Sequence, residues 1–169
     1  MGFNAGVLLT AFDPAEGTAR REDILGATAG PVRFSARPIL EDLGRGVANC
    51  PGNARELTVL RGWDARLSGT LVTADTRAAR RLAGFADESG GDIRPRNGID
   101  LLEDFFELWL VFDYGIGGGC ALRMRRALST GGFRVQTRPG DWTRWPFEFT
   151  ACVSLEEGDD AGFEIYMRG

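Results

Sequence analysis

The sequence contains neither histidine nor lysine. All 20 basic residues are arginine, against 24 aspartate and glutamate residues, and the net charge is −4. The missing residue types exclude histidine-based catalytic dyads, histidine metal sites and lysine nucleophiles. The acidic balance also argues against a protein that wraps nucleic acid or binds an anionic membrane, because such proteins carry a basic excess. We therefore expect a protein that is not an enzyme and has no membrane partner.

Cysteine is scarce as well. Cys50, Cys120 and Cys152 are odd in number and far apart, so they predict free thiols and no disulfide framework or zinc site, with Cys152 buried in a strand. No apolar run approaches the ~20 residues that a membrane span needs, and residues 1–10 carry no positively charged leader. We expect the protein to be made and to fold in a cytoplasm.

The length and the hydrophobic content bound the architecture. A chain of 169 residues that is 43% hydrophobic has the size of one domain. Such a chain buries about 70% of its unfolded surface, which is enough for a real core without metal or disulfide. We predict a single domain that spans residues 1–169.

Alternation of apolar and polar side chains dominates the chain and predicts half-buried strands. It occurs in residues 32–37, 63–71, 122–125, 133–138, 145–155 and 163–168, and Pro38 closes the first strand or places it at an edge. Residues 108–112 are apolar on both faces, which favours a central strand. One helix is predicted to begin at Asp75, a good N-cap, and to run to Ala83. The expected fold is mainly β, a β-sandwich or barrel flanked by one α-helix.

Two connections, residues 13–31 and 87–106, are too long for hairpin turns. Loops of this length without structure of their own are usually functional or disordered. The second one contains four apolar side chains that are predicted to anchor it, namely Leu101, Leu102, Phe105 and Phe106.

Three clusters invite a chemical interpretation, and each has a simpler one. Residues 115–119 are glycine-rich but lack the Lys-Ser/Thr of a phosphate loop and open no helix, so we predict a flexible hairpin. The acidic residues within 156–160 lack EF-hand spacing and predict a solvated turn. Asp100, Glu103 and Asp104 lie beside apolar anchors, which favours a capping or surface role over paired-carboxylate chemistry. The sequence predicts no catalytic, cofactor-binding or metal-binding residue.

Aromatic residues offer one further possibility. A stacking platform for single-stranded nucleic acid needs exposed rings, whereas aromatic residues in alternating strands belong more often to the core. The core interpretation is favoured for the four candidates, Trp109, Trp142, Trp145 and Phe147.

Short segments occur in a characteristic order along residues 30–168. They include ALSTGGF at 127–133, FEFT at 147–150 and FEIY at 163–166, preceded by NCP at 49–51, EL at 56–57, Trp63 leading into LSGT at 67–70, the helix at Asp75, PRN at 95–97 and DF at 104–105. This ordered set resembles the major tail proteins, or tail tube proteins, of long-tailed bacteriophages. The first thirty residues match only loosely.

The resemblance implies a β-sandwich flanked by a helix, whose copies join as six-fold rings with a continuous inner β-barrel. The rings would stack on a tape measure protein, end at tail terminator and distal tail or baseplate proteins, and conduct DNA without binding it specifically. The protein would lie in the virion tail after assembly in the host cytoplasm.

Under this resemblance, the connections 13–31 and 87–106 are expected to be assembly loops that contact other subunits. The first would present a charged tip and an apolar anchor to its neighbour, made of Arg20, Arg21, Glu22, Asp23, Ile24 and Leu25. Because this connection carries no alternating pattern, deletion of residues 17–27 is expected to leave a folded domain that forms no tubes.

A channel for duplex DNA must not hold phosphate tightly, so the net charge of −4 predicts an acidic or neutral lumen. Asp64 and Glu148, on the polar faces of long strands, are the candidate lumen residues, with pairing to Arg66 or to an arginine of another subunit as the alternative. Other arginines are expected to pair across subunits or to turn outward, namely Arg123, Arg125, Arg134 and Arg138.

Two alternatives stay open at the level of sequence. The chain could form the tube of a phage-derived particle, such as a tail-like bacteriocin or a gene transfer agent. From a different class, it could be a β-sandwich carbohydrate-binding module with Trp142 and Trp145 as a sugar platform.

Overall fold

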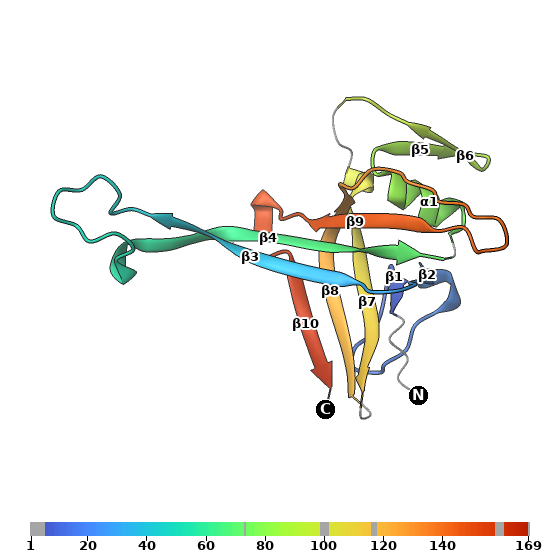
Figure 1. Ribbon diagram of the computed structural model, residues 1–169, viewed down its shortest axis with the longest axis horizontal. Coiled ribbons are helices and arrows are strands. Elements are labelled where there is room, and N and C mark those ends of the chain that lie inside the picture. Colours follow the sequence, from blue (N-terminus) through green and yellow to red (C-terminus); the bar gives the residue numbers. More distant parts are fainter. Residues whose placement is uncertain (1–5, 73, 99–101, 116–117, 158–160, 169) are drawn as a thin grey trace.

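A computed structural model describes residues 6–72, 74–98, 102–115, 118–157 and 161–168 (Figure 1). These residues form ten strands, one α-helix and four single turns of 3₁₀-helix, which confirms a mainly β fold with one helix. The strands are β1 (Val7–Leu9), β2 (Ile24–Ala27), β3 (Arg33–Asp42), β4 (Thr58–Leu71), β5 (Ala86–Ser89), β6 (Asp92–Pro95), β7 (Phe106–Gly115), β8 (Gly118–Ser129), β9 (Trp145–Ala151) and β10 (Phe163–Arg168), and the helix is α1 (Thr76–Ala83).

Eight of the strands form one antiparallel sheet in the order β2-β1-β7-β8-β9-β4-β3, with β10 paired to β8. The sheet forks at β8. One edge of β8 pairs with β7, whereas the other edge pairs with β10 over its first half and with β9 over residues 127–129. The two branches cross, so β3, β4 and β9 run over β7, β8 and β10 (Figure 1).

The end strand β2 meets β4, the strand next to the other end of the sheet, and the sheet thereby encloses the core. Thr28, just after β2, forms a bridge with Leu71 at the end of β4. The amide of Val72 donates to the carbonyl of Ala27 at 3.0 Å, and the amide of Ala29 donates to Thr70 at 2.9 Å. Strands β2, β1, β7, β8, β9 and β4 therefore surround the core like a small barrel, as the sequence predicted.

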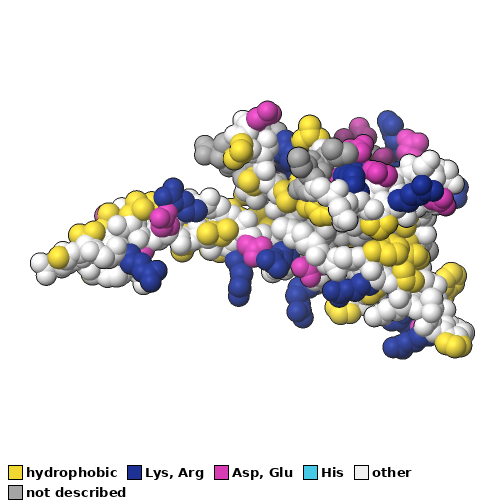
Figure 2. Space-filling view, turned by 90° about the horizontal axis from the view of Figure 1, so that it is seen from above, with side chains coloured by type: hydrophobic (Ala, Val, Ile, Leu, Met, Phe, Trp, Pro, Cys, Tyr) yellow, Lys and Arg dark blue, Asp and Glu magenta, His cyan; other side chains and the backbone are white. Residues whose placement is uncertain are grey.

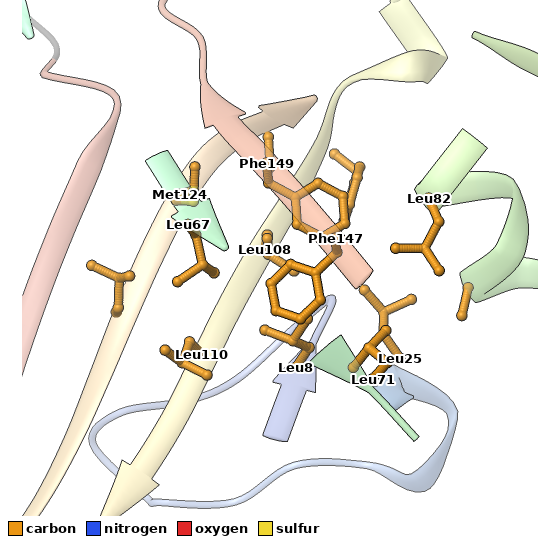
Figure 3. Packing of buried hydrophobic residues seen from close by; sticks show 14 residues of the cluster. Leu8, Leu25, Leu67, Leu71, Leu82, Leu108, Leu110, Met124, Phe147 and Phe149 are labelled. Atoms are coloured by element: carbon orange, nitrogen blue, oxygen red, sulfur yellow. The ribbon is translucent and has the colours of Figure 1, made fainter. Parts of the chain in front are cut away.

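The core fills with the apolar side chains of alternating strand positions (Figure 3). Its most deeply buried large side chains come from five different strands, namely Leu8, Leu67, Leu71, Leu108, Met124 and Phe149. The alternation predicted for β4, β8 and β9 is confirmed, because the intervening residues are more exposed. Trp109 and Phe147 are also buried, so their interpretation as core residues is confirmed.

Helix α1 has the predicted bounds. The carboxylate of Asp75 accepts a hydrogen bond of 2.7 Å from the amide of Ala78, which satisfies a free donor of the first turn. At the other end Gly84 has a φ of 74°, and a Cβ there would lie 3.0 Å from the carbonyl oxygen of Ser129. Ala78 and Leu82 turn inward and close one end of the core.

Two strand predictions are wrong, one entirely and one in its length. Residues 133–138 form no ladder and make one isolated bridge, between Gln136 and Arg144, with Phe133 and Val135 both exposed. Strand β9 ends at Ala151 instead of residue 155, because the chain turns into a 3₁₀-helix at 155–157. An alternating pattern records which residues could form a strand, but a strand also needs a partner with a free edge.

The two connections predicted as loops are mostly structured. Residues 13–31 contain β2, and Leu25 is a core residue at 4% exposure, so the premise of the 17–27 deletion is wrong. Residues 87–106 contain most of the β5-β6 hairpin and a 3₁₀-helix at Leu102–Asp104. Phe106 is buried as predicted, whereas Leu102 is exposed and anchors nothing; Leu101 lies outside the described residues.

Candidate assembly surfaces

The hairpin of β3 and β4 extends far beyond the rest of the molecule (Figure 1). We define residues 39–62 as the arm. The sequence did not predict the arm, because Pro38 interrupts the alternation of apolar and polar residues. Pro38 lies within β3, which pairs only with β4 among the described strands. Proline is tolerated there because the outward edge needs no donor, so the predicted edge position is confirmed.

One face of the arm continues the core-facing side of the hairpin. The pairs Phe34–Leu67 and Pro38–Trp63 lie over the body, and after a register shift the pair Leu40–Leu60 follows along the arm. Leu40 is 60% exposed and Leu60 is 49% exposed. Exposed hydrophobic side chains also include Ile39 and, at the tip, Leu43 and Val47. Figure 2 shows hydrophobic side chains along the arm, at the left of that view.

The tip of the arm is held by its own hydrogen bonds. The Asp42 carboxylate accepts from the amides of Gly44 at 2.9 Å and Asn53 at 3.1 Å. Leu43 donates its amide to the carbonyl of Leu57 at 2.9 Å. On one side of the ribbon Glu41 and Arg61 form an ion pair. The arm is therefore a shaped element that presents apolar side chains to solvent.

The two predicted lumen residues come together on the outer face of β3, β4 and β9. Arg66 donates two hydrogen bonds to Asp64, at 2.9 and 3.1 Å, and its Nη1 lies 3.8 Å from a carboxylate oxygen of Glu148. The hydrogen bond from Arg66 lowers the pKa of the Asp64 carboxyl below its usual value. The alternative pairing with Arg66 is thus present within the chain. Arg33 and Arg37 occupy the same face of β3, opposite Ser68 and Asp64.

A second polar network covers the outer face of β7, β8 and β10. Arg123 makes two contacts of 3.1 Å with Glu107 and one of 3.2 Å with Glu164. Glu164 also accepts from Arg125 and, at 2.6 Å, from the Tyr166 hydroxyl. Tyr166, Arg125 and Arg123 together lower the pKa of Glu164 to about 2. Arg123 and Arg125 therefore pair within the chain, and their predicted pairing across subunits is not needed.

The remaining predicted arginines and the predicted interface residues are mostly exposed. Arg134 and Arg138 are exposed, which fits the outward alternative. In the segment 20–25, Arg20, Arg21 and Glu22 are exposed, Asp23 is half-buried and Ile24 is 40% exposed. Leu25 is the exception, since it packs in the core of its own chain and cannot anchor a neighbour.

Trp142 and Trp145 line a groove of about 570 Å³ together with Ile24 and Val72. Trp142 is 71% exposed, so its assignment to the core is wrong. Trp145 is half-buried and packs against Phe133 at a centroid distance of 5.6 Å. The groove thus brings together Ile24, a predicted interface residue, and the two tryptophans of the predicted sugar platform.

The acidic residues between the β5-β6 hairpin and β7 have a structural role that the sequence missed. Asp104 is buried, whereas a capping or surface role was predicted. Arg96 donates to one of its oxygens, and Nη2 of Arg80 lies 3.7 Å from the other. The backbone carbonyl of Glu103 accepts from Arg81 at 2.7 Å. Asp100 lies outside the described residues.

The glycine-rich segment, the acidic segment and the cysteines were the remaining candidates for chemistry. Among the residues that the structure describes, no group of three or more cysteines, aspartates or glutamates could hold a metal ion. Strands β7 and β8 pair as far as Gly115 and Gly118, and residues 116–117 of the glycine-rich segment lie outside the description. Glu156 of the acidic segment is exposed, and residues 158–160 lie outside the description as well. All three cysteines are free, but Cys152 follows the end of β9 and is only half-buried, contrary to prediction.

Comparison with known families and curated proteins adds no identification. No protein-family model matches the chain, and no curated protein matches its sequence. In the described part of the chain, no helix has both the length and the apolar character to cross a membrane.

Proposed function

We propose that the chain is the subunit of a phage-type tail tube, which assembles as stacked hexameric rings around a channel for DNA. The observation that carries the proposal is the arm, a long hairpin with an uncovered apolar face. A two-stranded ribbon is marginally stable alone in water, and exposed apolar surface marks contacts with other molecules. The ordered resemblance to tail tube proteins supplies the kind of assembly.

The surface chemistry supports a structural subunit. The polar sheet faces carry arginines beside carboxylates, as in the Asp64–Arg66–Glu148 group and in the Glu107–Arg123–Glu164 group. Paired charges hold phosphate weakly, because Arg66 and Arg123 already have anionic partners. A wall of this kind lets DNA pass without stable binding. The tape measure, tail terminator and distal tail proteins would be the further partners, and the virion tail the location.

A carbohydrate-binding module is the second candidate, and the exposed Trp142 favours it. An exposed tryptophan beside a groove is a common stacking surface for sugars, but it is equally a common anchor at protein interfaces. A phage-derived tail-like bacteriocin or a gene transfer agent has a tube of the same kind. The features of the chain described above are the same for all of these particles.

Self-assembly of the purified full-length chain tests the proposal. Light scattering and negative-stain microscopy over a range of concentrations, with and without seeding, should show rings or tubes with a central hole. Replacement of residues 40–61 by Asn-Gly removes most of the arm and keeps the Pro38–Trp63 pair. This variant should keep a β-type circular dichroism spectrum with a cooperative thermal transition, and it should stay monomeric. A wild-type chain that is monomeric under every condition, and that binds glycans in a screen, would favour the carbohydrate module.

A further inference from the structure

The inner face of β7, β8 and β10 is apolar over its whole length, and its cover becomes incomplete along β10. Three rows of side chains cross these strands: Leu108, Met124 and Phe163, then Leu110, Leu122 and Ile165, then Phe112, Cys120 and Met167. On β10 the exposure rises to 53% at Ile165 and 70% at Met167. Leu110, Leu122 and Cys120 are buried in the same chain, so we define the shelf as the side chains of the second and third rows that are not buried, namely Phe112, Ile165 and Met167.

The shelf is exposed because, on β10, the crossing hairpin covers the first-row residue Phe163 only. Phe34 of β3 and Trp63 of β4 contact the Phe163 ring edge to face, at centroid distances of 5.4 and 5.8 Å. Beyond this crossing, β7, β8 and β10 continue past β3 (Figure 1). A groove of about 330 Å³ opens there between Val32 and Phe34 on one side and Leu110 and Phe112 on the other.

The arm presents the same kind of surface that already packs on β10. Phe34 and Trp63 cover Phe163 within one chain, and the pair Leu40–Leu60 continues that face of the hairpin outward. Two apolar sheet faces pack at about 10 Å with interdigitating side chains. Resting on the proposed tube function, we propose that the arm of one copy docks with its Leu40–Leu60 face on the shelf of a second copy.

The arm cannot serve its own shelf. An extended strand advances about 3.3 Å per residue, so Leu40 lies roughly 20 Å along β3 from Phe34. It lies on the part of the hairpin that extends away from the body (Figure 1). Electrostatics do not oppose contact with another copy. The arm contains three arginines and three carboxylates, so the whole net charge of −4 lies on the rest of the chain.

The geometry makes the contact heterologous, since the arm and the shelf are different surfaces. Each copy then donates one arm and offers one shelf, which generates closed rings or open helical stacks. The two surfaces are smaller than a standard interface, which buries about 1,600 Å² with 20–30 residues a side. Their exposed apolar side chains are Ile39, Leu40, Leu43, Val47, Leu60, Ile165 and Met167. A single contact is therefore weak, and assembly becomes stable only when contacts repeat.

Disulfide trapping tests the pairing. In a background with Cys50→Ser, Cys120→Ala and Cys152→Ser that is first shown to assemble, Leu60→Cys and Met167→Cys are combined. Oxidised assemblies should give a ladder of dimers, trimers and higher oligomers on a non-reducing gel. The matched control combines Leu60→Cys with Leu102→Cys, whose site is 93% exposed and far from the shelf, and should give no ladder.

A second pair of variants tests the shelf without cysteine. Ile165→Asp with Met167→Asp should fold, because both side chains are more than half exposed, and should lose assembly, whereas Leu102→Asp should assemble normally. If the wild type never assembles, the proposed function fails together with the docking. If the wild type and the shelf variant both form tubes, or if the cysteine pair closes within one chain, the docking is wrong while the tube function stands.

Discussion

At the scale of single residues, Asp104 decides how the β5-β6 hairpin joins the body. It is 2% exposed, yet it belongs to a 3₁₀-helix whose neighbour Leu102 is 93% exposed. Its partners, Arg96 after β6 and Arg80 on α1, come from two other elements. A buried carboxylate with such partners holds these elements in one arrangement.

Asp104→Asn should therefore destabilise the fold strongly. The substitution leaves the two arginines without their shared charge, and the loss of one member of a buried ion pair costs about 3–5 kcal/mol. Urea unfolding of the variant should show this loss as a lower midpoint. Asp87→Asn is the control, because Asp87 pairs with the same Arg96 at 2.7 Å but is largely exposed, and such pairs contribute about 1 kcal/mol or less. Equal effects of the two substitutions would contradict the role of Asp104.

Acid stability should depend on Glu164. Its pKa is lowered from 4.5 to about 2, first by the Tyr166 hydroxyl and then by Arg125 and Arg123. A lowered folded-state pKa contributes stability that is complete above about pH 4.5 and is lost as the pH falls towards 2. The free energy of unfolding of the wild type should therefore fall over this range more steeply than that of Glu164→Gln.

Tyr166→Phe provides the graded control for this pH dependence. It removes the largest cause of the lowered pKa and keeps both arginines. Its free energy of unfolding should begin to fall at the same pH as that of the wild type, about 4.5, because the unfolded-state pKa of Glu164 is unchanged. The fall should end at a higher pH and be smaller in total, because the folded-state pKa is less depressed. Identical pH profiles for the three proteins would show that the network contributes no stability through Glu164.

At the scale of elements, the contrast between β2 and the arm reverses the assignment made from sequence. Residues 13–31 looked like an assembly loop, yet they contain a strand that joins β1 and meets the end of β4. The arm, with its β-ladder and its apolar face, is the element that leaves the body. Neither element shows a clear alternation of apolar and polar residues. Strand β2 is too short for one, and in β3 the pattern is interrupted by Pro38 and by the register shift after Ile39.

Deletion of residues 17–27 should now unfold the chain. It removes β2 and the buried Leu25, and the loss of a buried leucine alone costs about 2–5 kcal/mol. Thermal unfolding monitored by circular dichroism should show no cooperative transition, or one at a much lower temperature. The control deletes residues 14–17, which lie in an exposed turn, and should melt close to the wild type. A native-like transition in the longer deletion would restore the assembly-loop interpretation.

At the scale of the whole molecule, the charge of the proposed channel wall is a matter of balance. On β3, β4 and β9 the outer face holds Arg33, Arg37 and Arg66 with Asp64 and Glu148. This face is mixed in charge, whereas the sequence alone predicted an acidic or neutral one. If this face lines the channel, the carboxylates of Asp64 and Glu148 keep the wall from being basic, because they offset the charge of the arginines.

Asp64→Asn combined with Glu148→Gln should therefore convert weak DNA contact into salt-dependent binding. Tubes of the variant should retain short duplex DNA in a sedimentation assay at low salt and release it at high salt, because each uncompensated arginine adds a phosphate contact. Wild-type tubes should retain little. Arg66→Gln is the opposite control and should lower any residual binding. Strong binding by wild-type tubes would contradict the balanced wall.

The sequence by itself determined the mainly β fold, the helix from its Asp75 cap, the positions of the core residues in β4, β8 and β9, and the free cysteines. These features follow from local periodicity and capping, which each segment expresses without its neighbours. Only the tertiary structure decided which residues within 133–138 and 145–155 pair in a strand. It also decided that Asp104 is buried and that β3 and β4 extend beyond the body as an arm. Strand pairing, burial and projection depend on where distant segments lie, because a strand needs a free edge and an apolar face needs a cover.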